Sequence, residues 1–126
     1  MALTRLLLAD KSALERTTPE TLELGELCTC AVVRLEMLYS ARSAAEYEQI
    51  EEALSSFRDL RMDAETIVTA TTAQRELAAR GRHRVPIPDL FIAACAQQHQ
   101  AGVLHLDRHY DALTEVLAFE SVPLPN

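Results

Sequence analysis

The sequence has no long apolar run, few glycines and prolines, and a deficit of positive charge. No segment approaches the ~20 consecutive apolar residues of a membrane-spanning helix, and the N-terminal run 6–9 is far too short for the core of a signal peptide. The three glycines and five prolines occur singly, without repeats or low-complexity tracts, which excludes collagen-like chains. These absences predict a globular cytoplasmic protein without a membrane partner.

Cysteine is scarce as well, and its number is odd. Cys28, Cys30 and Cys95 all lie in apolar surroundings, which favours reduced thiols in the core of a cytosolic protein. Cys28-Thr29-Cys30 resembles half of a metal site, but the sequence offers no second half. A chain of this length can bury roughly two-thirds of the surface that its unfolded form exposes. We therefore expect one domain, spanning residues 1–126, that folds without a disulfide or a structural metal.

Positive charge is the third shortage, because 12 Lys and Arg residues face 19 Asp and Glu residues and leave a net charge of −7. Proteins that bind nucleic-acid backbones usually carry a basic surface, so this balance argues at first against a nucleic-acid partner. The objection depends on where the acids lie, because acids gathered in one site leave the remaining surface less negative. Their positions therefore matter more than their number.

Short apolar segments alternate with segments of helical periodicity along the whole chain. This order predicts an α/β domain with a mainly parallel sheet of about five short strands, covered by helices on both faces. Thr18, Ser43 and Asp63 are expected to begin helices as N-caps, and Gly102 to end one. The expected strands are 5–9, 28–33, 60–62, 103–106 and 118–122, and the expected helices include 19–27, 34–42, 64–81, 89–101 and 110–115.

Four carboxylates fit a solvated surface less easily than the others, because each lies at the end of a strand or in the first turns of the helix that follows. They are Asp10, Glu36, Asp89 and Asp107. Taken singly, each has an ordinary explanation, since the aspartates can cap helices or offset a helix dipole and Glu36 can be a solvated helix residue. In a parallel sheet several of these positions meet at one edge. Converging carboxylates repel one another unless some are protonated or a cation lies among them, and such oxygen ligands suit Mg²⁺ or Mn²⁺.

Four segments, taken in order, resemble the motifs of PIN-domain nucleases, and specifically those of VapC-type toxins. The segments read Asp10-Lys11-Ser12-Ala13-Leu14, Arg34-Leu35-Glu36, Pro88-Asp89-Leu90-Phe91-Ile92-Ala93 and His105-Leu106-Asp107-Arg108-His109-Tyr110-Asp111, and the resemblance covers nearly the whole chain. The resemblance implies a metal-dependent endoribonuclease, the toxin of a type II toxin–antitoxin pair, that cleaves structured RNA of the tRNA or rRNA class. It also implies a cognate VapB-type antitoxin and a homodimer.

The resemblance further implies roles for individual residues. Asp10, Glu36, Asp89 and Asp107 would be the catalytic residues and would bind one or two Mg²⁺ or Mn²⁺ ions. Ser12 matches the motif serine whose hydroxyl supports the metal site.

Two residues depart from the family pattern. Lys11, the only lysine, stands where the family usually has Thr or Ser, and it can pair with a site carboxylate, contact a substrate phosphate or point to solvent. His109 stands where many relatives carry a further acid, and we expect it on a helix surface rather than among the ligands. Arg34, Arg108, Arg82 and Arg84 are further candidates for substrate contact, although the basic run 80–84 is also typical of a solvated helix end.

The sequence leaves alternatives open for one helix face and for the function. The face formed by Tyr47, Ile50, Leu54 and Phe57 can contribute to a dimer or belong to the core. A non-catalytic PIN-like binding module, with Lys11 in the metal space, is the main alternative to the enzyme. A phosphoacceptor receiver domain is disfavoured, because it needs a lysine late in the chain.

Overall fold

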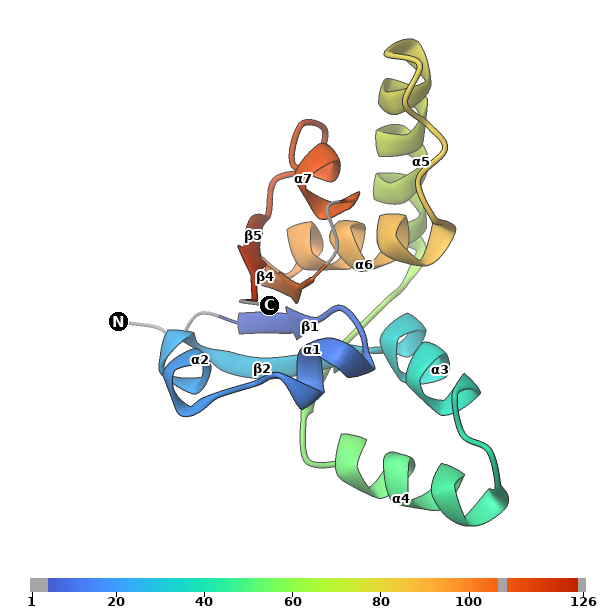
Figure 1. Ribbon diagram of the computed structural model, residues 1–126. Helices are drawn as coiled ribbons and strands as arrows, with labels where there is room; N and C mark the ends of the chain where they lie inside the picture. Colours follow the sequence, from blue (N-terminus) through green and yellow to red (C-terminus); the bar gives the residue numbers. More distant parts are fainter. Residues whose placement is uncertain (1–4, 107–108, 125–126) are drawn as a thin grey trace.

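A computed structural model of the protein describes residues 5–106 and 109–124. Its five strands are parallel and form one sheet in the order β3-β2-β1-β4-β5, as shown in Figure 1. The predicted α/β fold with a parallel five-stranded sheet is confirmed. The strands are β1 (Arg5–Leu8), β2 (Glu26–Cys30), β3 (Arg58–Leu60), β4 (Gly102–His105) and β5 (Glu120–Pro123).

Helices connect every pair of consecutive strands. The chain crosses the sheet in one direction from β1 to β3 and in the other from β4 to β5, and right-handed crossovers therefore place the two sets of connecting helices on opposite faces. Figure 1 agrees, with α1 to α4 on one side and α5 to α7 on the other. The helices are α1 (Lys11–Glu15), α2 (Pro19–Leu24), α3 (Ala31–Tyr39), α4 (Ala44–Leu54), α5 (Ala64–Ala79), α6 (Ile87–Gln98) and α7 (His109–Leu113).

The predicted N-caps are confirmed by hydrogen bonds from the first turns. The hydroxyls of Thr18 and Ser43 accept the backbone N–H groups three residues later, and the carboxylate of Asp63 accepts two such groups at the start of α5. Arg61 and Gln98 also donate to Asp63, and together they lower the pKa of this carboxyl group to about 2. Asp63 therefore joins the start of α5 to the end of α6.

Most element boundaries differ from the predicted ones by one to three residues, because strand pairing fixes them. The strand expected at 28–33 is β2, which pairs with β1 from Arg5↔Glu26 onward and ends at Cys30. This pairing ends α2 at Leu24 rather than residue 27, and α3 begins at Ala31 rather than Arg34. The strand expected at 60–62 pairs with β2 over Arg58–Leu60.

The prediction that Gly102 ends a helix is wrong. Gly102 is the buried first residue of β4, where a Cβ atom would lie 3.3 Å from the Glu120 carbonyl oxygen and from a methyl group of Leu6. Helix α6 ends instead at Gln98 with His99 as its C-cap, and Gln100 takes the left-handed conformation with a φ of 55°. Gly102 is thus needed for close strand packing rather than for a turn.

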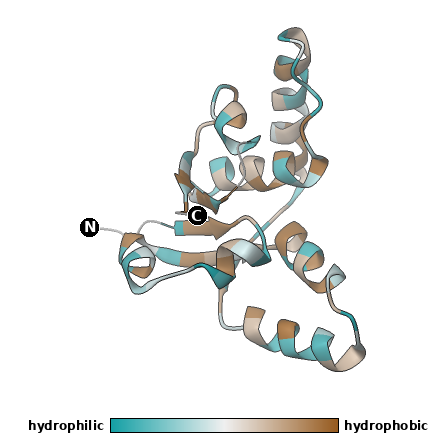
Figure 2. Ribbon diagram, viewed as in Figure 1, coloured by the Kyte–Doolittle hydropathy of each residue, from teal (hydrophilic) through white to brown (hydrophobic). Residues whose placement is uncertain are grey.

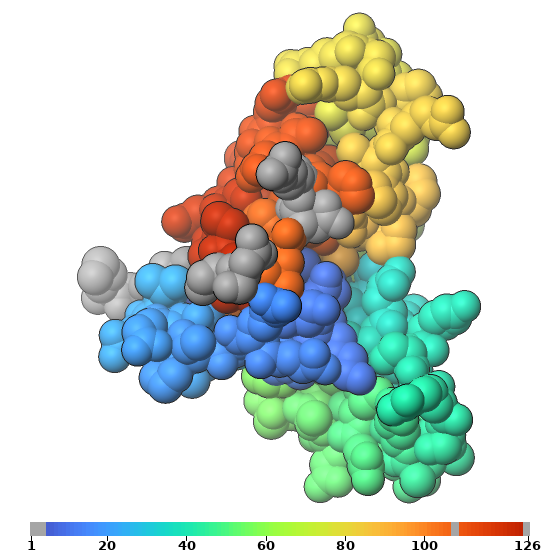
Figure 3. Space-filling view, viewed as in Figure 1, coloured from blue at the N-terminus to red at the C-terminus, as the bar shows by residue number. Residues whose placement is uncertain are grey.

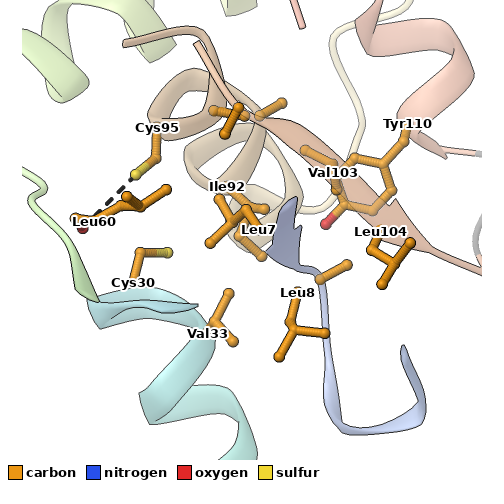
Figure 4. Packing of buried hydrophobic residues seen from close by; sticks show 14 of the residues in the cluster. Leu7, Leu8, Cys30, Val33, Leu60, Ile92, Cys95, Val103, Leu104 and Tyr110 are labelled. Atoms are coloured by element: carbon orange, nitrogen blue, oxygen red, sulfur yellow. Dashed lines mark hydrogen bonds between the residues drawn. The ribbon is translucent and has the colours of Figure 1, made fainter. Parts of the chain in front are cut away.

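The core lies between the sheet and its helices and is continuous through β1, β4 and α6. Leu7, Val103 and Ala93 are fully buried, and Figure 2 shows the hydrophobic residues gathered on the strands and α6. The prediction of reduced core cysteines is confirmed, since all three are buried free thiols. Cys95 donates to the Leu60 carbonyl, as Figure 4 shows. Within the described residues no helix is long and apolar enough to cross a membrane.

Candidate functional site

The edge formed by the carboxyl ends of β1 and β4 is the natural place for a site. These strands are neighbours, yet the chain leaves β1 toward β2 on one side and β4 toward β5 on the other. Open α/β sheets bind ligands where the strand order reverses in this way. The backbone N–H of Ala9 donates to the Leu104 carbonyl at 3.0 Å, which holds the segment after β1 against β4. Asp10 follows directly, so β1 delivers it to this edge.

Asp10 is also the N-cap of α1. Its Oδ1 accepts the backbone N–H of Ala13 at 2.8 Å, so the capping explanation offered by the sequence is correct. Capping does not compete with a ligand role, because a carboxylate has about four acceptor positions and this hydrogen bond uses one. The hydrogen bond instead fixes the direction of the carboxylate.

Asp89 lies in the first turn of α6 and is held by α7. The hydroxyl of Tyr110 donates to Asp89 Oδ1 at 3.1 Å, and Nδ1 of His109 lies 3.1 Å from Oδ2. The Asp89 side chain is only 18% exposed. Because α7 follows β4 after a short connection, these contacts tie Asp89 to the segment beyond the carboxyl end of β4. The helix-dipole explanation also applies, since Asp89 is the acid of the first turn.

The other two proposed ligands are placed differently. Glu36 is exposed on α3, where it lines a shallow hollow with Val32, Leu35 and Tyr39. Asp107 and Arg108 lie outside the described residues. Within 5–106 and 109–124 no three His, Cys, Asp or Glu side chains lie close enough together to hold a metal ion. The donor chemistry itself fits a hard divalent cation, because every proposed ligand is a carboxylate.

The residues near the motif aspartate Asp10 point mainly to solvent. Ser12 is exposed in α1. Lys11 is half-exposed, with its Nζ 3.9 Å from Glu15 Oε1 one turn further along the same helix. Such exposed pairs hold a side chain only weakly, so Lys11 can still reach a substrate phosphate.

Two of the four arginines proposed for substrate contact have intramolecular partners. Arg34 lies 3.3 Å from Asp59 in β3, and Arg82 lies 2.8 Å from Glu115 beyond α7. Arg84 is exposed in the segment between α5 and α6. All these pairs are open to solvent, and surface ion pairs contribute about 0–1 kcal/mol. A phosphate group can therefore replace the carboxylate partner at little cost.

Sequence reasoning did not identify the contacts that hold Asp89. His109 is exposed on a helix, as expected, but it also contacts the Asp89 carboxylate. Tyr110 was noted only as part of a motif, although it is 2% exposed and its hydroxyl reaches Asp89. An available signal was the position of Tyr110, one residue after His109, at the start of the helix that follows β4.

The chain is similar to known ribonucleases in sequence. The family profile described as "PIN domain" matches residues 2–116. Ribonuclease VapC17 of Mycobacterium tuberculosis is 43% identical over 114 residues, covering 85% of this chain and 86% of the relative. Ribonuclease VapC51 of the same organism is 35% identical over 106 residues, covering 84% and 77%.

Solved structures share the fold at lower sequence identity. VapBC-5 from Mycobacterium tuberculosis, a member of the VapBC family of toxin–antitoxin systems, has a TM-score of 0.74 at 22% identity and covers 96% of this chain and 99% of its own. DNA-bound VapBC from Salmonella typhimurium has a TM-score of 0.73 at 20% identity, with coverage of 95% and 98%. The chain therefore shares its overall fold with these proteins.

Proposed function

The chain belongs to the PIN-domain family, among its VapC ribonucleases, and on this premise we propose that it is the Mg²⁺- or Mn²⁺-dependent endoribonuclease toxin of a type II toxin–antitoxin pair, acting in the cytoplasm. The observation that carries the proposal is the delivery of Asp10 by β1, and of Asp89 by α6 and α7, to the edge where the strand order reverses. Carboxylates at this edge suit a divalent cation and a phosphodiester substrate.

Asp10, Glu36, Asp89 and Asp107 would hold one or two divalent ions, with Ser12 supporting them. A bound ion stabilises negative charge on the phosphate and makes the attacking water more acidic. The protein contributes fixed directions for two of the carboxylates, Asp10 through the N–H of Ala13 and Asp89 through α7. Glu36 sits on the second turn of α3, so substrate or metal would have to draw its long side chain toward the edge.

Structured RNA of the tRNA or rRNA class is the proposed substrate. Arg82 and Arg84 between α5 and α6, together with Arg34, Arg108 and Lys11, would contact its phosphates. Such contacts position the RNA without reading its sequence. The net charge of −7 does not oppose this proposal, because four of the acids are assigned to the metal site, where each bound divalent ion offsets two negative charges.

A VapB-type antitoxin and a second copy of the chain are the proposed protein partners. Several structural neighbours are VapBC complexes. Helix α5 and the α3–α4 pair project as separate lobes in Figure 3, and four large apolar side chains are exposed on α3 and α5. Leu35, Tyr39, Ile67 and Val68 are between 57% and 84% exposed. By contrast Leu54 is buried and Ile50 and Phe57 pack on the core, so of the two alternatives left open for the face of Tyr47, Ile50, Leu54 and Phe57, core is the one that most of its residues fit.

Induced expression in a bacterial cell tests the proposed function. We expect the wild-type chain to arrest growth and to create new RNA 5′ ends at a few positions in one tRNA or rRNA, and co-expression of the cognate antitoxin to restore growth. Asp10→Asn is a suitable inactive variant, because Asn caps helices as well as Asp does while removing the charge. Glu48→Gln, at an exposed position of α4, is the matched control and should behave as wild type. Growth arrest without new RNA ends would contradict the proposal.

A further inference from the structure

The contacts around Asp89 extend beyond its own helix into a small network of polar groups on α7, β4 and β5, in which Tyr110 and His105 are buried and Asp111 is exposed. Tyr110 is the link between this network and the carboxylate. The ligands proposed above for the metal are carboxylates, and the hydroxyl of Tyr110 is not among them. Its role can be argued from where its ring and its hydroxyl lie.

The ring of Tyr110 is fixed by the core. It is 2% exposed, and its centroid lies 4.8 Å from that of His105 on β4. Figure 4 places Tyr110 beside Val103 and Leu104, at the β4 end of the hydrophobic cluster. A ring packed in this way has little freedom to rotate, so the direction of its hydroxyl is set by the fold.

The neighbour of that ring is fixed in turn by hydrogen bonds. Nε2 of His105 lies 2.6 Å from the Ser121 hydroxyl on β5, and this hydroxyl donates to Asp111 Oδ1 at 3.2 Å. The Ser121 hydroxyl has a single proton, and when it donates that proton to Asp111, Nε2 of His105 is the donor in the first of these bonds. The side chains of β4, β5 and α7 therefore hold one another in place beneath Tyr110.

The hydroxyl of Tyr110, whose position is fixed by these contacts, binds a carboxylate of the proposed metal site. It donates to Asp89 Oδ1 at 3.1 Å, while His109 contacts Oδ2. Each carboxylate oxygen can accept more than one interaction, so these bonds orient Asp89 and still leave acceptor capacity for a cation. Partners of this kind, which hydrogen-bond a metal ligand without touching the metal, typically change metal affinity or activity by about 10–100-fold when removed.

We propose that Tyr110 is a positioning residue, whose hydroxyl holds the Asp89 carboxylate in the direction required for binding a divalent cation. The inference rests on the proposed function, since it takes Asp89 as a ligand. Tyr110 itself touches neither the metal nor the RNA. Its removal should therefore weaken metal binding without changing which RNA positions are cut.

Tyr110→Phe tests the proposal, because it deletes the hydroxyl and keeps the packed ring. The control is Tyr47→Phe, which deletes the same atom from a tyrosine that is 42% exposed on α4. Calorimetric titration of the metal-free chain with MnCl₂ should give a dissociation constant roughly tenfold higher for Tyr110→Phe than for wild type, and an unchanged constant for Tyr47→Phe. We expect an effect at the low end of the range of about 10–100-fold, because His109 still contacts Asp89 in this variant.

A second measurement separates positioning from stability. The thermal midpoint of each variant is measured without metal and with a fixed MnCl₂ concentration, so that the shift caused by metal is compared rather than the midpoint itself. Positioning predicts a smaller metal-induced shift for Tyr110→Phe, whereas a merely structural role lowers the metal-free midpoint and leaves the shift unchanged. Ser121→Ala, which keeps Tyr110 intact but removes the partner of His105, should reduce the shift in the same direction by a smaller amount.

Three outcomes separate this inference from the function beneath it. If wild type binds Mn²⁺, Asp89→Asn loses that binding and Tyr110→Phe weakens it, the inference stands. If wild type and Tyr110→Phe bind Mn²⁺ equally while Asp89→Asn does not bind, the positioning role is overturned and the proposed function survives. If wild type binds no Mn²⁺, the proposed function fails and the inference fails with it.

Discussion

Replacing Asp89 by Asn is expected to lower the rate of RNA cleavage by about a thousandfold while leaving the fold intact. A metal ion contributes several kcal/mol to stabilising the transition state, and each 1.36 kcal/mol corresponds to about a tenfold change in rate. The amide has the shape of the carboxylate and can still accept the hydrogen bond from Tyr110, but it lacks the negative charge that attracts a divalent cation. The measurement is the single-turnover rate of cleavage of an end-labelled structured RNA by the purified chain.

The control for this experiment is Glu48→Gln, the same chemical change on the exposed face of α4. It should cut the RNA at the wild-type rate. Circular dichroism of both variants checks that the fold is retained. Equal cleavage by wild type and Asp89→Asn would mean that the activity comes from another site or from a contaminating nuclease.

Leu7→Ala is expected to have the largest effect on stability. Leu7 lies on β1, the central strand of the sheet, and is completely buried. Deleting its three terminal carbons should lower the free energy of unfolding by about 3 kcal/mol, since buried Leu→Ala substitutions cost about 2–5 kcal/mol. For a chain of this size that loss corresponds to a fall of about 10 °C in the thermal midpoint.

Urea titration followed by circular dichroism measures this change. Leu22→Ala on α2 is the matched control, because that leucine is 55% exposed and surface substitutions usually change stability by less than about 0.5 kcal/mol. A similar loss for the two variants would contradict the position of β1 at the centre of the core. Asp10 lies two residues after the end of the same strand, so the protein's stability and the placement of its proposed site depend on one element.

The fold could be predicted from the sequence because β1 and β4 are short buried runs and because α1, α2, α4 and α5 each begin at a residue whose side chain caps the helix. Strand boundaries could not be predicted, because pairing with neighbours decides them. No residue within the run 28–33 indicates where the strand ends and the helix begins. The structure places this boundary after Cys30, the last residue of β2 that pairs with β3, opposite Leu60. Gly102 was misassigned for a similar reason, since a glycine that admits a neighbouring strand looks the same in a sequence as one that ends a helix.

The site could be predicted only in part. Asp10 and Asp89 could be proposed as site residues because strand ends and helix starts are visible in the sequence, and parallel sheets bring such positions to one edge. The ion-pair partners of the arginines could not be predicted, because the partners are distant in the sequence. Arg34 of α3, for example, pairs with Asp59 of β3. The role of Tyr110 was hidden because an aromatic residue on a short helix is usually core, and only the structure shows its hydroxyl reaching Asp89.

The proposal of a divalent-ion-dependent ribonuclease is tested most directly by removing and restoring the ion. Purified wild-type chain is treated with EDTA, dialysed and assayed on an end-labelled structured RNA, before and after the addition of MnCl₂. We predict no specific cleavage after EDTA and recovery of cleavage at the same positions when Mn²⁺ is added. Cleavage that persists at these positions in excess EDTA would contradict a role for the carboxylates as metal ligands, and absence of cleavage under all conditions would favour a non-catalytic binding module.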